Sequence, residues 1–159
     1  MYMKKLVIAA CLLASMSFSA VAINPAAPFV PAYTTEKGVN VSVRADLDIK
    51  NYDGGSVEIL LYTQIDNPEK PYITWKLNHF YYVLDPHGTG KPISVLYRVD
   101  RVTNFSRNSD YVMSGSVQPT PIVPIIEGSD EYKTAVYAYN FAVQSGKMSE
   151  AQAKYKGKK

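Results

Sequence analysis

Two histidines, His79 and His87, are the side chains in this sequence best suited to acid–base catalysis or metal binding. A catalytic histidine needs a partner within hydrogen-bond reach, and Ser94 or Asp85 could supply one, but no Gly-x-Ser-x-Gly turn surrounds them. A zinc site needs three or four ligands, and neither histidine has another ligand at suitable spacing on its own segment. We therefore expect a partly buried strand residue at position 79, a solvated turn residue at position 87, and no catalytic or metal site.

Residues 88–91, Gly-Thr-Gly-Lys, resemble part of a phosphate-binding loop. The complete motif has a longer spacing between its glycines, a Ser or Thr after the lysine, and a helix that follows. Here Pro92 follows and the next segment is a predicted strand. We expect a hairpin turn, and we expect no cofactor.

Three aspartates, Asp46, Asp48 and Asp53, could line an outward patch of the kind that binds calcium. The segment lacks the alternating oxygen ligands and the bidentate glutamate of an EF-type loop. Arg44 and Lys50 share the same predicted strand face. We therefore expect a solvated face.

The sequence contains 13 tyrosines, an unusually strong compositional signal. Tyrosine is rigid and amphipathic, which suits contact with a protein partner or a glycan. It equally suits a sheet in which the rings pack while the hydroxyls stay hydrated, so both interpretations stay open. The candidate partner-binding residues are Val39, Val41, Val43, Tyr81, Tyr82, Tyr137 and Tyr139.

The first 22 residues have the pattern of a bacterial secretory signal peptide. Lys4 and Lys5 precede an apolar run at residues 6–14, and the segment ends in Ala20-Val21-Ala22. This run is too short for a transmembrane segment. Lipid attachment at Cys11 is the alternative, but cleavage there would leave an apolar segment of only five residues, 6–10. Cleavage after position 22 predicts an exported protein of 137 residues without cysteine, located in the periplasm, at the cell surface or in the medium.

Charge divides the chain into an acidic body and a basic end. Residues 23–146 contain 13 acidic and 10 basic side chains, whereas five lysines crowd residues 147–159. Nucleic-acid binding would require basic residues spread along one face among exposed aromatic residues, so we expect no nucleic-acid partner. The basic tail could touch acidic surfaces.

Strand patterns dominate the rest of the chain. Residues 39–49 alternate strictly between apolar and polar side chains, and residues 57–65 continue the pattern after a turn, which predicts a hairpin. Further strands are expected at residues 72–84, 93–105, 111–117 and 132–143. The last of these has apolar residues on both faces. Residues 119–126 contain three prolines and are expected to form an edge strand or a crossing loop.

These patterns predict an all-β fold, an antiparallel β-sandwich, immunoglobulin-like or related, of about six to seven strands. The domain spans residues 39–146, behind an extended proline-rich leader at residues 23–38. A short, weakly helical tail follows at residues 147–159, with Ser149 as the expected N-cap.

Three classes of function fit this sequence. The leading hypothesis is an exported, non-catalytic binding or structural protein, such as a subunit or accessory component of a bacterial surface assembly, with a protein partner or self-association. The alternative is a periplasmic inhibitor, immunity or accessory factor that binds a single protein partner. A small hydrolase is less favoured because the sequence contains no paired catalytic constellation.

The signal peptide is testable by intact-mass measurement of the protein isolated from the producing cell. The mature chain should begin at Ile23, because the small-x-small triplet directly precedes this residue. A diacylated Cys11 at the N-terminus would contradict the prediction.

Overall fold

The computed structural model describes residues 27–87, 92–108, 112–116 and 119–157. The predicted signal peptide, the start of the leader and the turn at residues 88–91 lie outside these ranges. The strands are β1 (Phe29–Thr34), β2 (Asn40–Arg44), β3 (Asp48–Lys50), β4 (Ser56–Asp66), β5 (Tyr72–Leu84), β6 (Pro92–Ser106), β7 (Val112–Ser116) and β8 (Val123–Pro124). The helices are α2 (Asp130–Gln144) and α3 (Lys147–Lys156).

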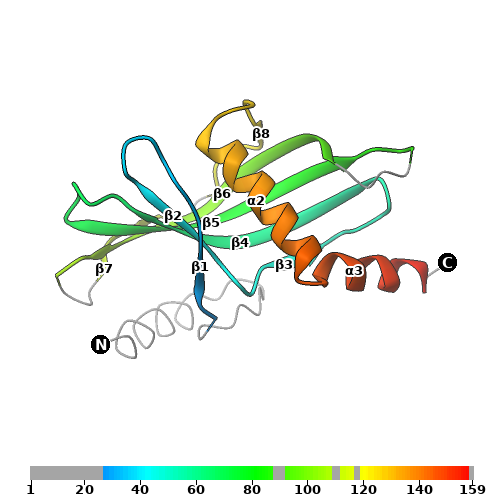
Figure 1. The fold of residues 1–159 in the computed structure, drawn as a ribbon, viewed down its shortest axis with the longest axis horizontal. Coiled ribbons are helices and arrows are strands. Elements are labelled where there is room, and N and C mark those ends of the chain that lie inside the picture. Colours follow the sequence, from blue (N-terminus) through cyan, green and yellow to red (C-terminus); the bar gives the residue numbers. More distant parts are fainter. Residues whose placement is uncertain (1–26, 88–91, 109–111, 117–118, 158–159) are drawn as a thin grey trace.

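The described strands form one open antiparallel sheet in the order β1-β2-β4-β5-β6-β7. The short strand β3 pairs with β4, and β8 pairs with β6. Figure 1 shows α2 lying across one face of this sheet. The predicted all-β fold is confirmed only in part, because the structure is mostly β and antiparallel but also contains two helices. The described strands build a single open sheet rather than a sandwich of two.

The described part of the predicted leader is a strand of this sheet. β1 pairs with β2, with Phe29 opposite Arg44 and Thr34 opposite Asn40. The register shifts between Pro31 and Tyr33, where β1 departs from the regular ladder. The leader thus supplies the outermost strand on this side of the sheet.

Residues 39–49 do not form the single strand that their alternation predicted. Val43 pairs with Thr63 and Asp48 with Leu60, so the four residues 44–47 lie opposite only two residues of β4, 61 and 62. The extra residues leave the ladder between β2 and β3 as a bulge, which is how one strand bends against a continuous partner. The bend turns Leu47 into the core, where its side chain is only 2 % exposed.

The strand expected at residues 132–143 is wrong, because this segment lies in helix α2. Ser129 caps the helix by accepting a hydrogen bond from the backbone N–H of Tyr132 on its side-chain oxygen at 3.1 Å. Ala135, Ala138 and Ala142 recur at spacings of three and four, which places them on one helix face, and all three are 0 % exposed. The tyrosines and valines between the alanines had suggested alternation.

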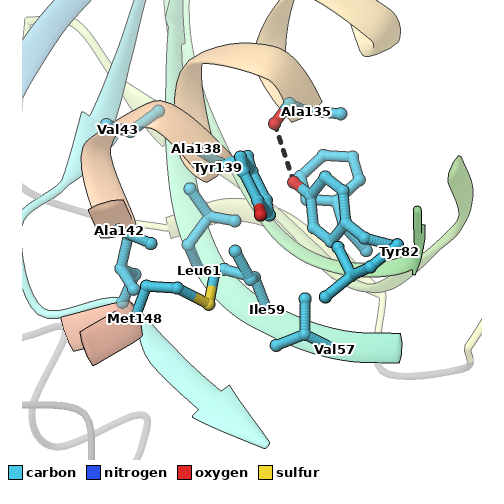
Figure 2. Close-up of a cluster of buried hydrophobic side chains, with 13 residues drawn as sticks. Val43, Val57, Ile59, Leu61, Tyr82, Ala135, Ala138, Tyr139, Ala142 and Met148 are labelled. Carbon is cyan, nitrogen blue, oxygen red and sulfur yellow. Dashed lines mark hydrogen bonds between the residues drawn. The ribbon is translucent and has the colours of Figure 1, made fainter. Parts of the chain in front are cut away.

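The main core lies between α2 and the sheet (Figure 2). Three β4 side chains, Val57, Ile59 and Leu61, alternate along that strand and are buried under the helix. On β5, Tyr82 is 1 % exposed, and its hydroxyl donates to the carbonyl oxygen of Ala135 at 2.7 Å. The helix therefore provides the second layer that the sequence pattern had assigned to a second sheet.

The C-terminal tail is the helix α3, and it begins two residues before the expected Ser149 cap. Gly146 occupies the N-cap position at φ 80°, a left-handed conformation that glycine adopts without steric cost. Met148 packs into the main core, and the ring of Tyr155 meets Tyr52 edge-on at 5.7 Å. Neither described helix is long and apolar enough to cross a membrane.

Val43→Asp should unfold the protein, because Val43 is 0 % exposed in strand β2 and its replacement would bury a carboxylate among apolar side chains. We expect a loss of several kcal/mol in the free energy of unfolding, measured by urea titration. Val83→Asp is the matched control, since Val83 is 39 % exposed, and it should cost about 0.5 kcal/mol or less. A folded monomer of the Val43 variant would contradict the internal position of β2.

Candidate functional site

The seven residues proposed for partner contact do not form one surface. Val43 and Tyr82 lie in the main core and have no exposed area to offer a partner. Tyr139 is 8 % exposed, and its ring lies 5.2 Å from that of Tyr82. Burial raises the pKa of the Tyr82 hydroxyl well above its ordinary value. These three side chains stabilise the contact between helix and sheet.

The other four candidates are divided among three places. Val39 and Val41 line a cavity on the helix-covered side of the sheet. Tyr81 lies on β5, at a position that faces the opposite side. The hydroxyl of Tyr137, on α2, donates to the carbonyl oxygen of Pro31 at 3.0 Å and ties the helix to β1.

The described residues form a cavity with a volume of about 470 Å³. Its lining residues come from the β1–β2 turn, from one face of β4 and β5, and from the first turn of α2. Its walls include apolar side chains and both signs of charge. The lining residues are Tyr33, Thr35, Glu36, Lys37, Val39, Val41, Thr63, Ile65, Lys76, Asn78, Phe80, Gly128, Asp130, Glu131, Lys133 and Thr134.

One wall of the cavity is fixed by a side chain from the edge strand. The Tyr33 hydroxyl lies 2.8 Å from the carbonyl oxygen of Asp130 and 2.8 Å from the hydroxyl oxygen of Thr134. Burial raises the pKa of Tyr33, and the hydrogen bond with Thr134 opposes this effect only in part. The β1–β2 hairpin is thereby tied to the start of α2, which keeps the cavity walls in place.

The floor of the cavity is polar and lies directly beside the apolar core residues of the same sheet face. Thr63 follows the buried β4 residues on the same face, and Asn78 precedes Phe80 and Tyr82 on β5. Thr63 and Asn78 are 3 % and 6 % exposed, and the Asn78 side-chain amide donates to the Thr63 hydroxyl oxygen at 2.8 Å. Lys76 stands directly opposite Thr63 in the β4–β5 register and lines the same cavity.

The opposite sheet face carries a separate cluster of charged side chains around His79, which is 8 % exposed. Its Nε2 lies 2.9 Å from Glu58 Oε2, and its Nδ1 lies 3.2 Å from the Tyr81 hydroxyl and 3.7 Å from Asp100 Oδ2. Arg98 Nε lies 2.6 Å from Asp100 Oδ1, aligned as an ion pair rather than as a hydrogen bond. Because both ring nitrogens are engaged, the cluster serves to hold strands β4, β5 and β6 together.

The three aspartates considered for calcium binding have local partners. Asp46 accepts two hydrogen bonds from Arg44 at 2.9 and 3.0 Å, and Asp48 lies 3.7 Å from Lys50. Asp53 accepts the backbone N–H groups of the turn that follows it, which lowers the pKa of its carboxyl group. Within the described ranges no three acidic, histidine or cysteine side chains gather as a metal site.

Sequence reasoning missed Thr63, Lys76 and Asn78 as site residues. A signal for them existed, since they continue the inward rows of strands whose preceding or following inward residues, Leu61 on β4 and Phe80 on β5, are apolar. These residues form the floor of a cavity only because the β1–β2 turn and α2 lie beside them. The sequence analysis predicted a strand at residues 132–143 instead of α2, so it could not predict the cavity.

Asp100→Asn should make stability less dependent on acid pH. Burial alone would raise the Asp100 pKa, but contact with His79 and the charge of Arg98 outweigh burial and lower it. The ionised carboxylate therefore stabilises the fold above the unfolded-state pKa of about 3.9, and this contribution is lost as pH falls through the lower folded-state value. Urea titrations between about pH 6 and pH 2 should show a shallower loss for the variant. Glu69→Gln, in an exposed turn outside the cluster, is the control and should change the slope less.

Comparison with known proteins finds no matching family model, no similar curated protein and no similar solved structure. Functional inference for this chain therefore rests on the contacts and burial of its own residues, and above all on the polar floor of the cavity beside α2.

Proposed function

We propose that this protein is an exported, non-catalytic binding protein that holds part of a protein partner in the cavity beside the start of α2. A subunit or accessory component of a bacterial surface assembly is the role that we assign to it. The observation that carries the proposal is the polar floor formed by Thr63, Lys76 and Asn78, directly beside the apolar core residues of the same sheet face.

The floor residues contribute little to folding. The hydrogen bond between Thr63 and Asn78 offsets the cost of burying their polar groups, but the net gain from such a bond is only about 1 kcal/mol. Apolar side chains at these positions would continue the core pattern of β4 and β5. Ligand sites are typically concave, with volumes of about 300–1,000 Å³ and a few polar groups that orient the ligand. A volume of about 470 Å³ falls within this range.

Self-association through sheet edges is a second candidate, because the described sheet is open and ends in β1 and β7. Exchange of the alternating segment 39–49 between copies would need a free strand, but its β2 part is paired on both sides, by β1 and by β4. β1 itself contains Pro31 and a register shift, two features that oppose edge-to-edge pairing. These observations favour a cavity-based contact over strand exchange.

A periplasmic inhibitor, immunity or accessory factor would also be a non-catalytic binder and could use the same cavity. The two roles differ in stoichiometry, since a factor of this kind forms one-to-one complexes whereas an assembly subunit occurs in many copies. Sedimentation velocity of the purified protein with its partner separates them.

Val39→Trp should abolish partner capture, because Val39 lines the cavity and an indole there would fill it. A photo-crosslinking residue is placed at exposed Lys37 on the cavity rim, and adducts formed in the producing cell are compared between variants. Val83→Trp is the control, since Val83 is 39 % exposed and does not line the cavity. We expect the adduct to persist in the control and to disappear in the Val39 variant.

Both variants should keep the melting temperature of the parent protein within a few degrees, which excludes unfolding as the cause of a lost adduct. An adduct that persists in the folded Val39 variant would place partner binding outside the cavity and contradict the proposal.

A further inference from the structure

We infer that the cavity recognises a carboxylate of the partner, bound by Lys76 and Thr63, with an adjoining apolar side chain packed on Val41 and Ile65. This inference rests on the binding function proposed above and names the chemistry of the bound group. A C-terminal carboxylate and the side chain of Asp or Glu share that chemistry.

Lys76 is the residue expected to bind an anion. It is half-buried on the helix-covered face of β5, and none of the ion pairs in the described part of the chain includes it. By contrast, Lys50 and Lys133 lie 3.7 Å and 3.5 Å from the carboxylates of Asp48 and Asp130. A lysine ammonium that lines a cavity and forms no ion pair among the described residues is available to bind an anionic group of a ligand.

Thr63 supplies the second donor. Its hydroxyl oxygen accepts a hydrogen bond from the Asn78 amide, whose other hydrogen-bond partner is the carbonyl oxygen of Lys76. Both amide hydrogens of Asn78 are thus used, and the amide orients the threonine hydroxyl. With its oxygen already accepting, Thr63 retains an O–H that can donate to a ligand oxygen. Asn78 is therefore a positioning residue, and Thr63 and Lys76 are the contacts.

The other charged side chains that line the cavity do not provide a second anion-binding group in its interior. Glu36, Lys37, Asp130 and Lys133 are exposed, so their charges are screened by solvent and balance in sign. Glu131 is half-buried, but it lies in the first turn of α2, where a carboxylate stabilises the helix dipole. The half-buried charge on the sheet floor is positive, which selects an anion for the interior of the cavity.

Binding is measured by amide chemical shifts of the ¹⁵N-labelled mature protein during titration with three peptides. The first is N-acetyl-Ala-Ala-Val with a free carboxylate, the second is its C-terminal amide, and the third is N-acetyl-Ala-Glu-Val amide, which carries only a side-chain carboxylate. We expect the free acid, the Glu peptide or both to shift Thr63 and Asn78 saturably, and the uncharged amide to bind about tenfold more weakly. Comparison of the two acids distinguishes a chain terminus from a side chain as the source.

Lys76→Met keeps the length and apolar stem of the side chain and removes its charge. It should weaken binding of the carboxylate peptides about tenfold, leave binding of the uncharged amide unchanged, and leave the melting temperature equal or higher. Lys70→Met, in an exposed turn away from the cavity, is the matched control and should bind as the parent does.

The inference is overturned if no carboxylate peptide binds, if the amide binds as tightly as the acids, or if Lys76→Met changes nothing. Should that occur while Val39→Trp still abolishes the cellular adduct, the binding function stands and only the carboxylate chemistry is wrong. Loss of both results would reject the cavity as the site.

Discussion

Three alanines on α2 set how closely the helix approaches the sheet, and the rest of the structure depends on that contact. Ala135, Ala138 and Ala142 have no exposed area and lie against the apolar row of β4 (Figure 2). Small side chains permit close contact between the helix backbone and the sheet, so dispersion contacts and burial act over the whole length of the interface. Without the helix, this face of an open sheet would be exposed to water.

The hydrogen bond from Tyr82 to the carbonyl oxygen of Ala135 depends on the same close approach. A larger side chain on the helix face would lift the backbone away and leave a buried hydroxyl without its acceptor. The contact also fixes where the helix begins. Helix α2 begins after its N-cap Ser129, near the end of the buried β4 row Val57, Ile59 and Leu61. The sheet face beyond this point carries the polar residues of the cavity floor.

The other sheet face is stabilised differently. Trp75 lies 4.9 Å from Phe29 and 4.8 Å from Phe105 between ring centroids, so aromatic contacts join β1, β5 and β6. The Arg44 guanidinium lies 4.8 Å from the centroid of the Tyr62 ring, a cation–π contact. Together with the charged cluster around His79, these contacts stabilise a face whose core cluster includes no residue of the two described helices. The high tyrosine content of the sequence is thus divided between helix packing, strand pairing and the cavity wall.

The sequence by itself determined the strands, because alternation of side chains is a local property of the chain. It placed the strand at residues 72–84 with the observed bounds, and those at 57–65 and 93–105 within a residue. It could not distinguish a strand from a helix at residues 132–143, where alanines at helical spacing alternate with aromatic and β-branched residues. The bulge between β2 and β3 also could not be predicted, since it depends on the register against β4.

The tertiary structure decided that the second layer is a helix, and it brought Lys76, Thr63 and Asn78 beside residues of β1 and α2 that are far away in sequence. Packing of distant segments, which no local pattern encodes, is the physical reason that the cavity could not be found from the sequence.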